Sequence, residues 1–377
     1  MKTRMTIKAL AAGLALGLAG LAQAQDIKIA NIVEMSGPGT TSGVMFKNGV
    51  EMAIKEINAA GGILGRKISY TNEDTQTNPG VAKGLTQKAV DNEVFAIFGP
   101  VYSGSIMVSM AESKRGETPN FTGGEAASIT QQGNPYVFRT AFGQSISFPK
   151  VARYLNAKSK KLAVLYVNND FGVGGRDTIK KLLAGSPTTI AAEISTDQGQ
   201  VDFSAAVIAA KQSGADALFA YTNEEESARL LRELRKQGWN KPVIGETVLT
   251  SAKVVELAGE AANGAVAHVG LTVEAPQLQG FGKKYQAAYN SVSDHNGVKG
   301  YTAMYILKAA IEKAGKLDRK AAAAALRNSC FSAKQHPGIL MDVCFDDKGD
   351  LDRESFITEI RNGKTVVTET LPPLSKK

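Results

Sequence analysis

Short apolar runs alternate along the chain with segments of helical periodicity, and this order predicts strands alternating with helices. The first run, Ile27 to Met35, predicts a strand. In the segment after it, apolar side chains recur at steps of three and four residues: Phe46, Val50, Ala53, Ile54 and Ile57. Such spacing places them on one face of a helix, which we expect from Ser42 to Ala59.

The same alternation continues over most of the chain. Further strands are predicted at Lys67 to Asn72, Phe95 to Phe98, Leu162 to Val167, Ala217 to Ala220 and Val243 to Gly245. Helices are predicted at Pro79 to Val90, Ser103 to Lys114, Gly174 to Leu183, Phe203 to Gln212 and Glu224 to Gln237. Alternating strands and helices indicate parallel sheets covered on both faces. One sheet rarely needs this many units, so we expect an α/β fold of two doubly wound lobes.

The amino terminus has the pattern of a secretory signal peptide. Lys2, Arg4 and Lys8 precede an apolar run of only Ala, Leu and Gly from Ala9 to Leu21, and an A-x-A site ends at Ala24. This run is shorter than the roughly 20 residues that span a bilayer. We therefore expect cleavage after Ala24, export to the periplasm and no stable membrane insertion; an uncleaved anchor is the alternative.

Composition and charge narrow the class of protein. Apolar residues make up 43% and charged residues 21% of the chain, which is typical of a folded globular protein. The net charge of +8 is spread along the sequence without a basic block, which argues against nucleic-acid binding. Cys330 and Cys344 are the only two cysteines. In an exported protein such a pair favours a disulfide over two free thiols.

Several motifs of catalysis or metal binding fail on their spacing. Gly172-Val173-Gly174-Gly175 lacks the third glycine of a dinucleotide fingerprint, because Asp177 stands there. The acidic segment Asp346 to Asp352 has its glycine two positions early for a calcium loop, and we interpret it as a polar turn. The three histidines lie at no metal-ligand or triad spacing. We therefore expect no enzyme activity, no metal and no cofactor.

Five blocks in the expected order resemble the solute-binding proteins of branched-chain amino acid ABC transporters. These blocks are Met35 to Pro38, Glu56 to Gly65, Phe98 to Ser105, Asn169 to Gly172 and Phe345 to Asp350, and the resemblance covers the chain from Gln25 to Pro373. It implies a type I periplasmic binding protein, in which the ligand lies between two lobes joined by three crossovers. The crossovers should fall near Thr140 to Gly143, Leu271 to Ala275 and Phe345 to Gly349. Lobe 1 would comprise residues 25–141 and 274–345, and lobe 2 residues 142–273 and 346–377.

The resemblance also implies a ligand site at the carboxyl ends of the strands. Ser103, which follows a strand and begins a helix, would bind a carboxylate together with nearby backbone N–H groups. The other expected site residues are Ser42, Tyr102, Gly123, Glu125, Phe171, Asn223 and Thr247. Tyr102 and Phe171 would contact an apolar or aromatic group of the ligand.

The position of the acidic partner for a ligand ammonium stays open at this point. The family's acid aligns with Thr247, whereas Glu125 stands at a position where the family has Thr. Either the carboxylate lies on the other side of the pocket than in the family, at Glu125, or the alignment is off by one residue and Glu246 is the family's ordinary ammonium partner. A surface helix cap is the alternative role for Glu125.

Two ligand classes follow from these residues. The first is a small amphipathic, branched-chain-like amino acid, captured by hinge closure and delivered to the permease subunits of an ABC importer. The second is an aromatic or other carboxylic acid without an ammonium group, carried in the same transport role. A monomer suits a protein that docks on a transporter.

Overall fold

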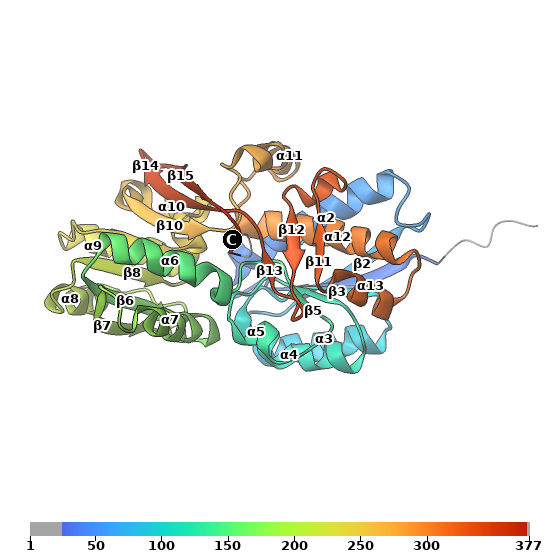
Figure 1. Ribbon diagram of the computed structural model, residues 1–377, viewed down its shortest axis with the longest axis horizontal. Helices are drawn as coiled ribbons and strands as arrows, with labels where there is room; N and C mark the ends of the chain where they lie inside the picture. Colours follow the sequence, from blue (N-terminus) through green and yellow to red (C-terminus); the bar gives the residue numbers. More distant parts are fainter. Residues whose placement is uncertain (1–24, 375–377) are drawn as a thin grey trace, which may run out of the picture.

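Two sheets organise the chain, and each forms the centre of one lobe. The computed structural model describes residues 25–374, and Figure 1 shows the two lobes side by side. The predicted signal peptide, residues 1–24, lies outside the described residues. Within residues 25–374, no helix combines the length and the hydropathy that crossing a membrane requires.

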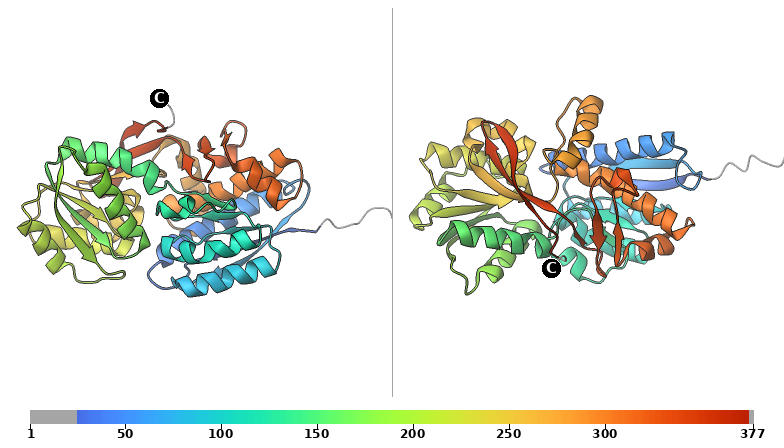
Figure 2. Two further views of the ribbon diagram at one scale, coloured as in Figure 1. Left: turned by 60° about the horizontal axis from the view of Figure 1, so that its bottom comes forward. Right: turned by 45° about the horizontal axis from the view of Figure 1, so that its top comes forward.

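Lobe 1 has a five-stranded sheet in which all neighbours are parallel. Its strand order is β2 (Ile68–Asp74), β1 (Ile27–Val33), β3 (Ala96–Phe98), β4 (Asn120–Thr122) and β5 (Val137–Arg139). The helices of this lobe are α2 (Thr40–Ala59), α3 (Pro79–Asp91), α4 (Ser103–Arg115), α5 (Ser128–Gln131), α12 (His295–Ala314) and α13 (Arg319–Leu326). Figure 2 shows these helices on both faces of the sheet.

Lobe 2 has a seven-stranded sheet with five parallel strands and an antiparallel hairpin at one edge. Its order is β15 (Lys364–Leu371), β14 (Ser355–Arg361), β10 (Ala265–Val269), β9 (Val243–Glu246), β8 (Ala217–Tyr221), β6 (Lys161–Val167) and β7 (Thr189–Thr196). Its helices are α6 (Gln144–Lys158), α7 (Asp170–Leu183), α8 (Ser204–Gln212), α9 (Glu224–Lys236) and α10 (Ala252–Ala258). The prediction of two doubly wound α/β lobes is confirmed.

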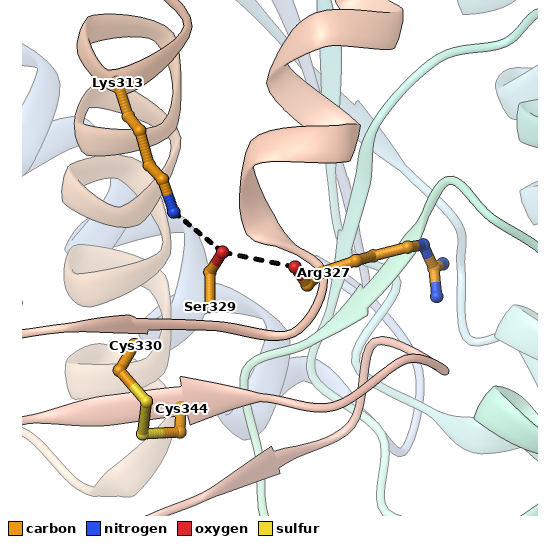
Figure 3. Close-up of a disulfide and its surroundings, with 5 residues drawn as sticks. All are labelled: Lys313, Arg327, Ser329, Cys330 and Cys344. Atoms are coloured by element: carbon orange, nitrogen blue, oxygen red, sulfur yellow. Dashed lines mark hydrogen bonds between the residues drawn. A yellow bond between two sulfur atoms is a disulfide. The ribbon is translucent and has the colours of Figure 1, made fainter.

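A third, antiparallel sheet carries the two cysteines. It consists of β11 (Ser329–Phe331), β12 (Val343–Phe345) and β13 (Leu351–Asp352). Cys330 and Cys344 lie directly opposite each other on β11 and β12 and form a disulfide (Figure 3). Beside it, the Lys313 ammonium of α12 donates to the Ser329 hydroxyl at 2.7 Å, so this small sheet is fastened to lobe 1 (Figure 3).

The chain passes between the lobes three times. The first passage follows β5 and ends at α6, and the second leads from β10 to α11 (Gln279–Tyr289), which hydrogen-bonds to α2 through Tyr285 and Tyr289. The third lies between Asp352 and Ser355, where the C-terminal segment leaves β13 for the hairpin β14–β15 (Figure 2). This is later than the predicted Phe345 to Gly349. Those residues instead form a turn whose Gly349 carbonyl accepts from the Arg139 N–H of β5 at 2.9 Å.

Helices α2 and α12 pack closely on one face of the lobe 1 sheet. The predicted apolar face of α2, from Phe46 to Ile57, is fully buried there. Two glycines allow the close approach. A Cβ at Gly49 would lie 2.0 Å from the carbonyl oxygen of Gly297, and one at Gly300 would lie 2.0 Å from that of Phe46. Helix α12 is therefore fixed against α2 along the segment that also faces the other lobe.

Candidate functional site

A cavity of about 160 Å³ lies between the lobes at the carboxyl ends of their parallel strands. Open α/β sheets bind ligands at this edge. Seven of the eight predicted site residues line the cavity: Ser42, Tyr102, Ser103, Gly123, Glu125, Phe171 and Asn223. Thr247 does not; it lines a smaller neighbouring cavity of about 40 Å³, while the next residue, Val248, reaches the main one.

Ser103 is the first residue of α4 and lies buried at the wall of the cavity. Tyr102, and not Ser103, is the cap residue of this helix. The Ser103 hydroxyl oxygen accepts from the Ala126 N–H at 3.2 Å, so its proton is available to an acceptor in the cavity. The first backbone N–H groups of α4 have no partner within the helix. Together these groups form a donor site suited to a carboxylate.

Glu34 holds the loop that leads into α4. Its buried carboxylate accepts from the N–H groups of Val101 and Tyr102, both at 3.1 Å. Burial nevertheless raises the pKa of Glu34 to about 7. Because these two N–H groups are already bonded, only donors from Ser103 onward face a ligand.

Glu125 lies at the centre of the lobe junction and is 6% exposed, which excludes the surface-cap interpretation. One carboxylate oxygen lies 3.3 Å from the Lys299 ammonium of α12, and the other accepts from the Tyr221 hydroxyl of β8 at 3.3 Å. Burial, and the carboxyl group of Glu246, raise the pKa of Glu125 to about 7, although Lys299 opposes the shift.

Glu246 lies behind Glu125 and does not line the cavity. Its carboxylate accepts from the Thr247 N–H at 2.6 Å and lies 3.2 Å from Nδ1 of His268. Burial raises its pKa to about 7, and a hydrogen bond joins it to Glu125. The two carboxyl groups therefore lie close enough to influence each other's pKa, beside the single ammonium group of Lys299.

An aromatic wall closes one side of the cavity. Phe171 stacks on Tyr221 with ring centroids 4.0 Å apart, and Gln144 donates both to the Phe171 carbonyl and to the Tyr221 hydroxyl. Tyr102 also lines the cavity, with its hydroxyl donating to the Pro38 carbonyl at 3.2 Å. Phe171 thus presents a flat apolar surface whose position is fixed from behind.

Acidic side chains also lie at the cavity. Ser42 of α2 donates to the buried Glu224 carboxylate of α9 at 2.7 Å, and Thr41 donates to Glu225 at 2.8 Å, so these bonds join the two lobes directly. Atoms of Glu224, Asp294 and His295 that could bind a cation lie within 4.8 Å of one another. Burial raises the pKa of Glu224 to about 8 and that of Asp294 to about 6.

These buried carboxyl groups predict an unusual pH dependence of stability. Glu34, Glu125, Glu246 and Glu224 bind a proton more tightly in the folded protein than in the unfolded chain, where the pKa is near 4.5. The free energy of unfolding should therefore fall as the pH rises from ~5 to ~8. His268, whose pKa burial lowers to about 3, opposes this trend below its ordinary pKa, but the carboxyls are more numerous.

Urea unfolding of the wild type and Glu246→Gln at several pH values measures this effect. The glutamine carries no titrating proton, so the decline in stability should be shallower in the variant. Equal slopes for both proteins would contradict the role of Glu246.

The charged residues of the junction that were not predicted from the sequence include Glu34, Glu224 and Lys299. Each had a usable signal. Glu34 is a charged residue inside the first run, Ile27 to Met35. Glu224 directly follows the predicted Asn223, and Lys299 interrupts the periodicity of a long, mostly apolar helix. A charge in such a position is buried only when paired, and it therefore indicates a partner elsewhere in the fold.

Comparison with known proteins places this geometry in context. The family model described as "Periplasmic binding protein" matches residues 26–365. The Leu/Ile/Val-binding protein BraC3 of Rhizobium johnstonii is 30% identical over 97% of this chain and 100% of its own length.

Solved structures show the same fold with different ligands. The branched-chain amino acid transporter substrate-binding protein of Streptococcus pneumoniae, in complex with isoleucine, superposes with a TM-score of 0.81 at 25% identity, over 92% of this chain and 99% of its own. An ABC transporter solute-binding protein of R. palustris, in complex with benzoate, superposes with a TM-score of 0.84 at 21% identity, over 93% and 98% of the two chains.

Proposed function

Because the chain belongs to the periplasmic binding protein family and is a solute-binding protein of the ABC-transporter type, we propose that it captures a small amphipathic amino acid of the branched-chain kind and delivers it to a permease. The observation that carries this proposal is the cavity between the lobes, which is lined both by a helix start suited to a carboxylate and by acidic side chains.

The cavity suits such a ligand group by group. The carboxylate would lie at Ser103 and the first turn of α4, where the helix dipole favours negative charge. The apolar side chain would contact Phe171, Val101 and Val248, which line the cavity. Closure about the three passages between lobes would bury the ligand, and the ligand favours closure only through contacts that are better in the closed state.

An aromatic acid without an ammonium group is the second candidate. Two observations favour it: Lys299 already pairs with Glu125, and Phe171 offers a flat ring surface. The benzoate complex of the R. palustris protein shows that this fold accepts such a ligand. The transport role is the same in both cases.

We further propose that the protein works in the periplasm after cleavage at Ala24, as a monomer that docks on permease subunits. The disulfide between Cys330 and Cys344 supports an oxidising compartment. No cofactor or metal enters this proposal.

A thermal-shift screen of the mature protein, stripped of bound ligand by unfolding and refolding, tests the ligand class. A ligand at 100 times its dissociation constant stabilises by about 2.7 kcal/mol, which raises the melting temperature measurably. We expect shifts with leucine, isoleucine, valine, alanine or threonine. Shifts with benzoates alone would replace the amino acid by the second candidate, and the transport role would stand.

Ser103→Ala should weaken the binding of every carboxylate ligand about 10-fold, because it removes a hydrogen bond to a charged group. Ser109→Ala is the matched control, since Ser109 lies on the same helix but bonds within it to the Ile106 carbonyl. Isothermal titration with the amino acid that gives the largest thermal shift measures both. Equal affinities would remove Ser103 from the site.

A further inference from the structure

The buried charged groups at the cavity divide into two sets, and only one of them contains an ion pair with a lysine; the exposed Asp170 also lines the cavity. Lys299, Glu125 and Glu246 form the first set, which is held together by ion pairs and hydrogen bonds. Burial raises the pKa of both carboxyl groups to about 7, and the ammonium of Lys299 pairs with Glu125. This set therefore already contains its own cation, and little negative charge remains in it for a ligand.

Glu224 and Asp294 form the second set. Within residues 25–374, no lysine or arginine forms an ion pair with either of them, and the ion-pair partner of Asp294 is His295 at 3.8 Å. Burial lowers the pKa of His295, which keeps its ring neutral at pH 7. Asp294 is held in place by the N–H groups of Asn296 and Gly297 at the start of α12, and Glu224 by Ser42. Buried carboxyl groups in this situation are suited to a cation.

The cavity therefore offers a partner for each of the two charges of a zwitterion. Ser103, Glu224 and His295 all line this one cavity. We infer that Glu224, supported by Asp294 and His295, binds the ammonium group of the ligand, while Lys299 keeps Glu125 from doing so. The inference rests on the proposed amino acid ligand and adds the residue that selects for it.

Binding should then release a proton. Glu224 faces Asp294 and His295 at the start of α12, Ser42 of α2, Tyr102 before α4 and its own neighbours Glu225 and Glu226. Lys299 of α12 lines the same cavity and acts on Asp294 and His295. Lys299 forms its ion pair with Glu125 and not with Glu224, and burial raises the pKa of Glu224 to about 8, so Glu224 is mostly protonated at pH 7 before an ammonium group binds. Ligand binding at pH 7 should expel that proton, and the measured heat should vary with the ionisation enthalpy of the buffer.

The experiment compares Glu224→Gln with wild type by isothermal titration, using L-leucine and 4-methylpentanoate, the same skeleton without the ammonium group. We expect Glu224→Gln to weaken leucine at least 10-fold and to abolish its proton release, with less than a threefold effect on 4-methylpentanoate. If the substitution acted only through the lost bond to Ser42, it would weaken the binding of both compounds equally. The ratio of the two affinities therefore isolates the ammonium contact. Glu233→Gln, on the outer part of α9, is the matched control.

Each other outcome overturns the inference in a recognisable way. Unchanged leucine binding in Glu224→Gln, with weakening in Glu125→Gln, would place the ammonium at Glu125 and leave the proposed function intact. Binding of 4-methylpentanoate but not leucine would contradict both the inferred ammonium site and the proposed amino acid ligand. Failure of every amino acid and acid in the screen would overturn the proposed ligand itself. A Glu224-dependent thermal shift with Zn²⁺ alone, and none with amino acids, would assign the cluster to a metal ion.

Discussion

Asp350→Asn is expected to lower the free energy of unfolding by about 3 to 5 kcal/mol, because it leaves a buried arginine without its counter-ion. The Arg139 guanidinium is fully buried, and its Nε lies 2.8 Å from Asp350. Its other nitrogens donate to the carbonyls of Gly124 and Ala126, on either side of Glu125. The ion pair therefore holds the cavity loop as well as the turn before the third passage between lobes.

Urea unfolding measures this effect through the midpoint at an unchanged m-value. Asp347→Asn is the control, since Asp347 lies in the same turn with an exposed side chain. If both variants unfolded at the wild-type midpoint, the pair would make no net contribution. We also expect weaker ligand binding in Asp350→Asn, because the loop that carries Glu125 loses its support.

Gly49→Ala should destabilise the protein by about 3 kcal/mol, at the upper end of the usual cost of overpacking. The new methyl group would meet the backbone of Gly297, and a carbonyl in a helix cannot move aside as a flexible side chain can. Helix α12 would have to shift away from α2. Because Asp294 caps this helix and His295 and Lys299 lie on its first turns, the cavity would change as well.

Thermal unfolding and leucine titration of Gly49→Ala measure both effects. Gly84→Ala is a matched control, because Gly84 lies within helix α3 with open space around it. There alanine should be neutral or slightly stabilising, as its helix propensity exceeds that of glycine. A Gly49→Ala protein as stable as the Gly84→Ala protein would show that the helices separate without cost.

The strand and helix order could be predicted from the sequence because each element has its own apolar period. The face of α2 from Phe46 to Ile57 is one example, and the structure buries all of it. The turn from Asp346 to Asp350 was recognised, but the third passage was placed too early. Arg139 holds that turn through its ion pair with Asp350. The two residues are more than 200 positions apart, so no local sequence pattern reveals the pair.

The site was predictable to the extent that it follows the ends of strands. Ser103, Phe171 and Asn223 each come just after a predicted strand, and all three line the cavity. Lys299 could not be placed in the same way, because its distance from Glu125 depends on how α12 packs across the lobe junction. For the same reason the sequence could not decide whether Glu125 or Glu246 faces the ligand. That decision depends on how the two carboxyl groups and Lys299 pack together in the fold.

The bond from Thr41 to Glu225 of α9 connects the lobes through a glutamate that does not line the cavity. The part of the closure equilibrium that this bond favours is the same for every solute. It raises the apparent affinity for all solutes alike, because apparent affinity scales with the fraction of molecules already in the binding-competent shape. Discrimination must then come from the cavity alone. If a permease recognises the closed form, some ligand-free protein in that form would also dock on it. A strengthened α2–α9 contact should therefore tighten solute binding but lower the rate of transport.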